Sequence, residues 1–317
     1  TPKKALIYCI ISSAAWHLAS FGGIYVGFLP LFFYALLKQS EVKEARYAFY
    51  FGLLNGLLIY SIHLRFFRII FADASFALWS IISLWLALFL LGAHFLRKYL
   101  PGKLALIAIP LLFFSLEFSR SELYFLKFSW GSIGFHTFQN PSSMAIQWTG
   151  LYGFSFVLFL LVCVCERLKV KSRLIALSTI AALLSLLSTI TTSPQTAGHN
   201  NPLISGIQLE FPSTAEVING LDTLLLQYPD TDIILLSENT FKEVPEEVFN
   251  WCRDNQKYLV AGANFKTADK KNFYNTATVI NPQGKIEFKQ VKCTPIQFFK
   301  DGLPATEQQL WESPWGK

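Results

Sequence analysis

The sequence predicts a polytopic α-helical membrane domain of about seven spans, followed by an α/β domain. Hydrophobic residues make up 52% of the 317 residues, and the mean hydropathy is +0.38, which is more apolar than is usual for a soluble protein. The apolar residues form long runs before residue 193, whereas the remainder alternates short strand and helix patterns. We therefore expect a transmembrane domain over residues 1–199 and an α/β domain over residues 200–317.

Seven apolar runs account for the predicted spans. They cover residues 5–20, 22–37, 47–64, 75–96, 104–119, 144–166 and 174–192. A helix that crosses a bilayer needs about 20 mostly apolar residues, and the second run is short and interrupted by Gly and Pro. A second apolar run follows the first directly, which argues against a cleavable signal peptide.

The basic residues between the runs predict the orientation in the membrane. The connections between the runs fall alternately into two sets. The connections of one set carry twelve Lys and Arg in total, and those of the other set carry four. The larger set consists of Lys3, Lys4, Lys38, Lys43, Arg46, Arg97, Lys98, Lys103, Arg167, Lys169, Lys171 and Arg173, and the smaller set of Arg65, Arg68, Arg120 and Lys127. The positive-inside rule places the larger set in the cytoplasm. Seven spans then place residue 200 onward in the periplasm or on the outer face of a bacterial inner membrane.

The basic character of the chain comes from the membrane domain alone. Residues 1–199 carry 16 Lys+Arg and 6 Asp+Glu, a net charge of +10, and residues 200–317 carry 11 and 15, a net charge of −4. Since basic residues flanking spans serve orientation, the high pI is no evidence for a nucleic-acid partner.

Beyond a polar linker at residues 193–202, the pattern predicts helices packed on a sheet. Strands are expected at 203–210, 231–239 and 257–265, with two more around a Pro-Gln-Gly turn within 275–289, and helices at 213–228 and 246–256. The last residues, WESPWGK, add turn residues without a strand or helix. We expect the sequence, which begins at Thr1, to stop within this domain.

One buried strand of the α/β domain ends on a charge. The apolar residues Ile233 to Leu236 are followed by Ser237, Glu238 and Asn239. A charge at the end of a buried strand costs free energy unless it has partners or a chemical role. Glu238 is therefore a candidate site residue, and the alternative is an acid that simply reaches solvent.

Several stretches resemble a known enzyme family. Residues 114–156, FSLEFSRSELYFLKFSWGSIGFHTFQNPSSMAIQWTGLYGFSF, resemble a segment of bacterial apolipoprotein N-acyltransferases. The stretches SGIQLE, LLSENTF, FYNTATVINPQGKIEFK and PIQFFKDGLPA resemble successive blocks of the carbon-nitrogen hydrolase (nitrilase) superfamily, to which the outer domain of that enzyme belongs. The resemblance implies an αββα sandwich with a Glu-Lys-Cys triad.

The resemblance assigns two of the three triad positions. Glu238 lies where the family has its general base, and Lys292 lies closest to the position of its lysine, with Lys289 as second choice and Lys300 in the same block. A solvated surface lysine is the alternative in each case. The spacing to Pro295 differs from the common form of the family, and the Gly-Glu pair that normally follows this proline is missing.

No cysteine is assigned as nucleophile. Cys9, Cys163 and Cys165 lie in apolar runs, and Cys252 and Cys293 lack the family context. The Cys and His spacing matches no metal site. In the membrane domain, Glu117 and Arg120 are expected to pair at i,i+3 and to fix the loop that follows.

The resemblance implies acylation of lipoproteins. A phospholipid would donate an acyl group to an enzyme thiol, and the amine of a diacylglyceryl-cysteine at the lipoprotein N-terminus would then take it, without metal or organic cofactor. Two alternatives stay open: another membrane-anchored amidase or acyltransferase of the same superfamily, and a non-catalytic membrane subunit.

Overall fold

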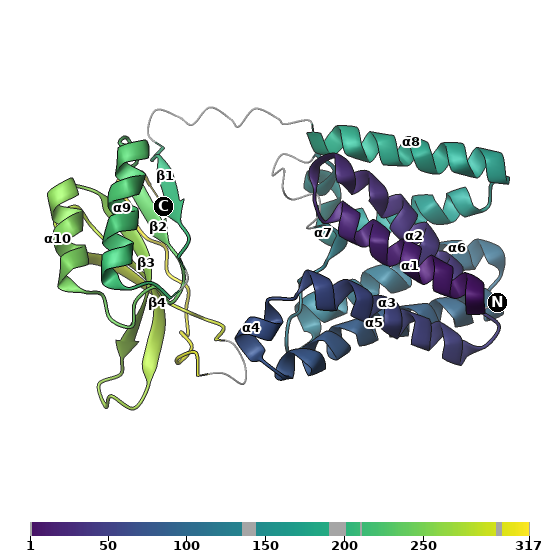
Figure 1. Cartoon of the computed structure of the whole chain (residues 1–317), viewed down its shortest axis with the longest axis horizontal. Helices are drawn as coiled ribbons and strands as arrows, with labels where there is room; N and C mark the ends of the chain where they lie inside the picture. Colours follow the sequence, from purple (N-terminus) through teal and green to yellow (C-terminus); the bar gives the residue numbers. More distant parts are fainter. Residues whose placement is uncertain (1, 135–143, 190–200, 210, 296–299, 317) are drawn as a thin grey trace. The chain divides into compact units, whose positions relative to one another are not determined.

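The computed structural model describes residues 2–134, 144–189, 201–209, 211–295 and 300–316 (Figure 1). Contacts divide the chain into two compact units, residues 1–194 and 195–317. Most of the predicted linker, residues 193–202, lies outside the described residues, as does part of the resemblance segment 114–156.

The first unit is helical and has a helix at each of the seven predicted apolar runs. Its elements are α1 (Pro2–Ala19), the 3-10 helix η1 (Gly23–Phe28), α2 (Leu29–Gln39), α3 (Ala45–His63), α4 (Phe67–Phe71), α5 (Ala74–Tyr99), α6 (Gly102–Phe118), the π-helix η2 (Ser119–Leu123), α7 (Met144–Glu166) and α8 (Val170–Thr189). The second run is divided between η1 and α2, and Pro30 lies in the first turn of α2, where a proline costs no helical hydrogen bond.

Four helical segments among the described residues are long and apolar enough to cross a membrane. They are Ala74–Tyr99, Gly102–Leu123, Thr149–Glu166 and Val170–Thr189, and Gly23–Gln39 is a shorter apolar segment. Polar side chains of α1 and α3 form hydrogen bonds with each other. The Asn55 amide donates to Ser12 Oγ at 2.5 Å, and Ser13 Oγ donates to Asn55 Oδ1 at 2.9 Å. Such bonds hold helices together in lipid but lower their hydropathy, so seven spans stay a prediction.

Two glycines bring α3 and α5 into close contact. A Cβ atom on Gly52 would lie 2.5 Å from the Ala87 Cα, and one on Gly56 would lie 2.6 Å from the Ser83 Cα. Glycines four residues apart therefore form a flat strip on α3, against which α5 packs backbone to backbone. Small residues at this spacing are typical of helix pairs in membranes.

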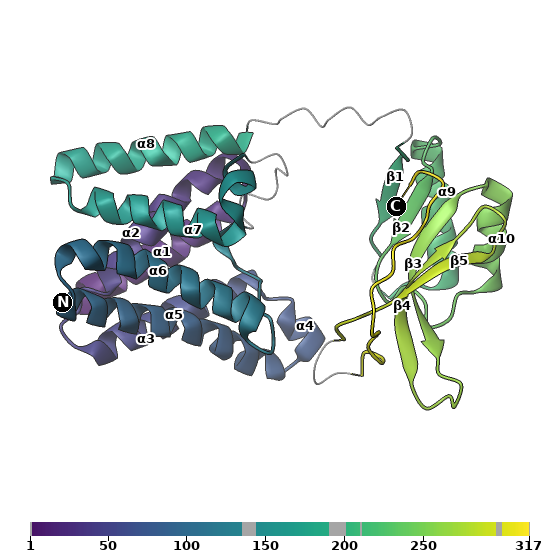
Figure 2. The same ribbon diagram turned by 180° about the vertical axis from the view of Figure 1, so that it is seen from behind.

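The second unit is a mixed sheet with helices on one face (Figures 1 and 2). Its elements are β1 (Ile204–Ile207), α9 (Thr214–Gln227), β2 (Ile233–Leu236), α10 (Glu246–Asn255), β3 (Tyr258–Lys266), β4 (Phe273–Ile280) and β5 (Ile286–Val291). The sheet order is β1-β2-β3-β4-β5, in which β1, β2 and β3 are parallel and β4 and β5 antiparallel. Each strand and helix predicted for this unit is present.

The core of the α/β unit lies between the sheet and the two helices. Leu221 of α9 and Cys252 of α10 are fully buried against Ile234, Leu259 and Ala263 of the sheet. Ser213 begins α9 with a capping box, in which its hydroxyl accepts from the Glu216 N–H and the Glu216 carboxylate accepts from the Ser213 N–H. The described residues form one sheet and one helix layer, which is half of the expected αββα sandwich.

The α3–α5 contact predicts that Gly56→Ala destabilises the helical unit, because the added methyl group would meet the α5 backbone. Overpacking costs about 1–3 kcal/mol, and a lowered thermal unfolding midpoint in detergent would report it. Gly153→Ala in α7 is the matched control, since the nearest atom to its Cβ is at 3.4 Å. Equal midpoints for the two variants would contradict close packing at Gly56.

Candidate active site

Glu238 lies two residues after the end of β2, where the chain crosses β3. A Cβ on Gly262 of β3 would lie 2.6 Å from the Glu238 Cα and 2.6 Å from the Asn239 nitrogen, so only glycine allows this crossing. The Phe241 N–H then donates to the Gly262 carbonyl at 3.0 Å. Asn239, with φ of 59°, supplies the left-handed residue of the turn. The backbone thus presents Glu238 at the carboxyl end of β2.

The structure brings Lys292 into contact with Glu238. Lys292 Nζ lies 2.7 Å from Glu238 Oε1 and 2.8 Å from Asp301 Oδ2. The Asn275 amide donates to the same two carboxylates, to Glu238 Oε1 at 2.8 Å and to Asp301 Oδ1 at 3.0 Å. One ammonium and one amide therefore join two carboxylates, and the four side chains form a closed hydrogen-bonded cluster.

Backbone contacts hold this cluster together. The Lys292 N–H donates to the Asn275 carbonyl at 2.8 Å, and the Ala305 N–H donates to the Lys292 carbonyl at 3.0 Å. Gly302 has φ of +88°, and a Cβ there would lie 2.9 Å from the Asn275 nitrogen. The loop that carries Asp301 can therefore approach β4 only with glycine at position 302.

The electrostatics of the cluster favour a charged lysine. Burial by itself would lower the pKa of Lys292, but its hydrogen bonds to Asp301 and Glu238 and their negative charges raise this pKa above its usual value. The Asp301 side chain is 10% exposed and that of Glu238 is 53% exposed. Asp301 therefore anchors the lysine, while Glu238 stays open to a reactant.

A cavity of about 400 Å³ lies beside the cluster. Glu238, Asn275 and Lys292 line it together with Val260 and Gly262. Along β3, the residues Leu259, Ala261 and Ala263 alternate with these and belong to the core under the helices. The cavity consequently opens on the sheet face opposite α9 and α10, with the carboxylate and the ammonium in its wall.

The two other candidate lysines lie elsewhere. Lys289 Nζ lies 3.5 Å above the centre of the Phe265 ring, and burial lowers the pKa of Lys289. Phe265 packs against the core under the helices, so Lys289 belongs to the other face of the sheet. Lys300 is exposed. Of the three lysines, Lys292 is the one that contacts Glu238.

The thiols of the α/β unit differ in their access to the cavity. Cys252 is fully buried in the core, and burial raises its pKa to about 12. Cys293 lines the cavity, but its thiol donates to the Val291 and Glu307 carbonyl oxygens, each 3.7 Å from Sγ. Cys293 is the thiol nearest the cluster in sequence, and its sulfur also accepts from the Gln290 side-chain amide at 3.7 Å.

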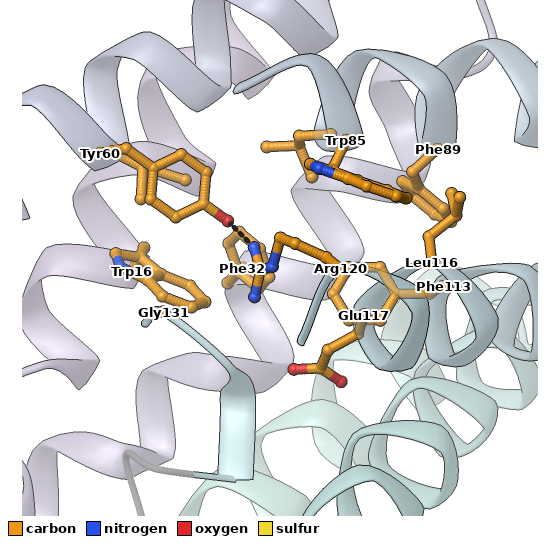
Figure 3. Close-up of a pocket in the computed structure, with 12 residues that line it drawn as sticks. Trp16, Phe32, Tyr60, Trp85, Phe89, Phe113, Leu116, Glu117, Arg120 and Gly131 are labelled. Atoms are coloured by element: carbon orange, nitrogen blue, oxygen red, sulfur yellow. Dashed lines mark hydrogen bonds between the residues drawn. The ribbon is translucent and has the colours of Figure 1, made fainter. Parts of the chain in front are cut away.

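A second polar site lies inside the helical unit (Figure 3). Glu117 and Arg120 are 6% and 4% exposed and border a cavity of about 30 Å³ among aromatic side chains. The predicted ion pair between them is wrong. Arg120 donates to the Tyr60 hydroxyl at 2.8 Å and to Ser132 Oγ at 3.3 Å, and Glu117 Oε1 accepts from the Ile133 N–H at 2.7 Å.

The geometry of η2 explains this outcome. Arg120 lies in the π-helix, which widens the backbone after α6, and the two side chains reach separate partners. Ser132 and Ile133 belong to the loop that follows, so both charged residues hold that loop without contacting each other. The expected effect on the loop is present, and it comes from the hydrogen bond that each of the two residues makes to the loop.

The family of the helical unit follows from its sequence. Residues 8–164 match the family model described as the apolipoprotein N-acyltransferase N-terminal domain. The helical unit belongs to the apolipoprotein N-acyltransferase family. The match runs from within α1 to most of α7 and includes the site of Glu117 and Arg120.

Two solved structures are similar to part of this chain. One is Saccharomyces cerevisiae Nit3, a member of branch 10 of the nitrilase superfamily, at 15% identity and a TM-score of 0.29, covering 32% of this chain and 45% of that one. The other is a carbon-nitrogen hydrolase from Helicobacter pylori G27, at 21% identity and a TM-score of 0.29, covering 34% and 46%. The chain thus spans less than half the length of either protein. No curated protein matches it.

Asn275, Asp301 and Gly262 were not identified from the sequence. Asn275 begins the strand stretch NTATVI, where a polar residue is unremarkable. The sequence held one signal for Asp301: it is an acidic residue between Lys300 and Gly302 in PIQFFKDGLPA, one of the stretches that resemble the nitrilase superfamily. Gly262 could not be recognised, because its role is defined by a crossing segment 24 residues earlier.

The cluster predicts that Asp301→Asn lowers the pKa of Lys292, because the substitution removes one of the two charges that stabilise the ammonium. An NMR titration of the labelled lysine side chains in the full chain would measure the change. Asp269→Asn is the matched control, since Asp269 bonds to Thr267 and Lys271 instead. An unchanged Lys292 titration would show that Asp301 does not act on it.

Proposed function

We propose that this protein takes part in the N-acylation of lipoproteins, with the α/β unit carrying the reaction. The supporting observation is the contact of Lys292 Nζ with Glu238 Oε1 at 2.7 Å in the wall of a 400 Å³ cavity, in a chain whose membrane unit belongs to the apolipoprotein N-acyltransferase family. The acyl donor is a phospholipid, and the acceptor is a lipoprotein with an N-terminal diacylglyceryl-cysteine.

The first step is transfer of the acyl group to a thiol. Glu238 accepts the proton of the thiol, the thiolate attacks the ester carbonyl carbon, and a C–S bond forms as the ester C–O bond breaks. The released lysophospholipid oxygen takes the proton back. Glu238 Oε1 already accepts from Lys292 and Asn275, so Oε2 is the oxygen suited to carry the proton.

The second step returns the thiol. The lipoprotein amine attacks the thioester carbonyl carbon, a C–N bond forms as the C–S bond breaks, and Glu238 passes the proton lost by the amine to the leaving thiolate. In both steps a negative charge develops on the carbonyl oxygen, and the Lys292 ammonium is the donor nearest the base. A raised pKa keeps this donor charged, and loss of such a donor typically costs about 2.7–4 kcal/mol of transition-state stabilisation.

The membrane unit explains how both lipid substrates reach the site. Phospholipid and lipoprotein lie in the same bilayer, so a membrane-bound enzyme collects them without releasing their acyl chains into water. The distribution of basic residues between the loops supports a location of the α/β unit on the outer face of the bacterial inner membrane. No metal or organic cofactor has a part in the chemistry proposed.

Glu238→Gln should reduce formation of the acyl-enzyme about 10²–10⁴-fold in the full-length protein, because it keeps the size of the side chain and removes the base. A thioester trapped from a labelled phospholipid measures the step directly. Glu243→Gln is the matched control, since this acid follows the same strand and does not line the cavity. A wild-type rate in Glu238→Gln would make Glu238 a solvent-exposed acid without catalytic function.

Residues 1–317 alone should form no hydroxylamine-sensitive adduct with a labelled phospholipid. Cys252 is buried in the core, and the hydrogen bonds of Cys293 are to backbone carbonyls and Gln290, not to Glu238. The measurement compares the wild-type chain with Cys293→Ser. An adduct that forms on the wild type and disappears in Cys293→Ser would identify Cys293 as the nucleophile.

A further inference from the structure

A cavity of about 180 Å³ lies in the helical unit between α2, α5, α6 and α7. Its polar wall consists of Arg97, Glu166 and Arg167, and the start of α6 closes one side. The N-terminus of the chain and the α5–α6 and α7–α8 turns lie at this same end of the unit (Figures 1 and 2). Glu238 and Lys292 belong to the other unit, so this cavity is separate from the candidate active site.

The single carboxylate of the cavity is already neutralised. Glu166 Oε1 lies 2.6 Å from Lys38 Nζ, and Glu166 Oε2 lies 2.8 Å from Arg97 Nη2. The Glu166 side chain is 10% exposed, so both contacts are shielded from water and strong. An incoming anion therefore meets a carboxylate whose charge is compensated.

The surrounding cluster keeps an excess of positive charge. Lys38, Arg97, Arg167 and Arg173 contribute four positive charges, and Glu41 and Glu166 contribute two negative charges, which leaves +2. Arg97 Nε is buried and has no hydrogen-bond acceptor among the described residues. Arg167 uses Nη2 to donate to the Gly102 carbonyl at 2.7 Å. The cluster thus has unused donors and unbalanced charge at the cavity.

The start of α6 adds to the positive potential. Among the residues that the structure describes, no side chain caps this 17-residue helix, and its first turn contains no acid. A helix N-terminus carries a partial positive charge and unpaired N–H groups. A Cβ on Gly102 would lie 3.1 Å from Arg167 Nη1, so glycine leaves the space in which the guanidinium lies over the helix start.

The remaining wall of the cavity is apolar. Ala105, Leu106 and Ile109 follow one another along α6, and Leu37 faces them from α2. α6 is one of the helices long and apolar enough to span the bilayer. An anion site that continues into an apolar wall within the membrane matches a lipid, with its phosphate at the arginines and its acyl chain along α6.

We propose that this cavity binds the phosphate of an anionic glycerophospholipid. The end of the unit that holds it carries the basic connections that the positive-inside rule assigns to the cytoplasm, where anionic lipids are drawn to basic residues. The bound lipid bridges α5, α6 and α7, three helices that otherwise meet here through Glu166 and Arg167. It is a second lipid site and contributes no acyl group to the reaction.

Binding is tested on the delipidated full chain in detergent. Native mass spectrometry and the thermal unfolding midpoint are recorded with dioleoyl phosphatidylglycerol, with dioleoyl phosphatidylcholine, and with glycerol phosphate. We expect a retained adduct and a raised midpoint with phosphatidylglycerol alone. Equal effects of phosphatidylcholine would overturn the anion site, and equal effects of glycerol phosphate would overturn the role of the apolar wall.

Variants connect the binding to this cavity. Arg167→Gln should weaken phosphatidylglycerol retention about fivefold, the effect of about one basic residue near a membrane surface, and Arg167→Lys should restore most of it. Ala105→Leu should also weaken retention by filling the apolar wall while leaving every charge in place. Arg46→Gln is the control, because Arg46 has the same predicted location but pairs with Glu44. Unchanged retention in Arg167→Gln and Ala105→Leu, or an equal loss in Arg46→Gln, would refute the proposal.

Discussion

A charge removed from water must be given partners, and this requirement determines how both units of the protein are built. In the α/β unit the Lys292 ammonium lies between two carboxylates at 2.7 and 2.8 Å. In the helical unit Glu166 lies between Lys38 and Arg97 at 2.6 and 2.8 Å. Removing a partner of the largely buried Glu166 would leave an uncompensated charge out of water, which destabilises the fold. Segments far apart in the chain are thereby fixed to one another.

The same requirement has different uses in the two units. Around Lys292 the partners are unequally buried, since Asp301 is 10% exposed and Glu238 is 53% exposed. This asymmetry holds the lysine from one side and offers a carboxylate to the cavity on the other. Around Glu166 the excess lies with the cations, so the group attracts a further anion. Structural ion pairing and the proposed reactivity of Glu238 are thus compatible within one cluster.

Glycines make these arrangements sterically possible. Gly262 allows the backbone at Glu238 to cross β3, and Gly302 brings the Asp301 loop against β4. Gly102 gives Arg167 its place over the start of α6, and Gly52 and Gly56 join α3 to α5. In each case the absence of a side chain on the glycine leaves room for another residue or backbone segment to lie close to it in space. The chemistry of the sites therefore depends on positions that have no side chain.

The sequence by itself determined the elements and the class of each unit. Apolar runs placed the helices of the first unit, and alternating patterns placed every strand and helix of the second, because hydrophobic periodicity is a local property. Glu238 could also be identified as a candidate site residue, since a charged residue at the end of a buried apolar strand is visible in a short stretch of sequence. The division of basic residues between connections was readable in the same way.

Only the tertiary structure decided which partners the charged residues have. Glu117 and Arg120, neighbours in sequence, bind separate groups because the π-helix η2 intervenes. Lys292 rather than Lys289 meets Glu238, because the two lysines lie on opposite faces of the sheet. Asp301 and Asn275 joined the site through loop and strand contacts that no local pattern encodes. A contact between distant segments depends on backbone paths and steric clearance, and these exist only once the chain has folded.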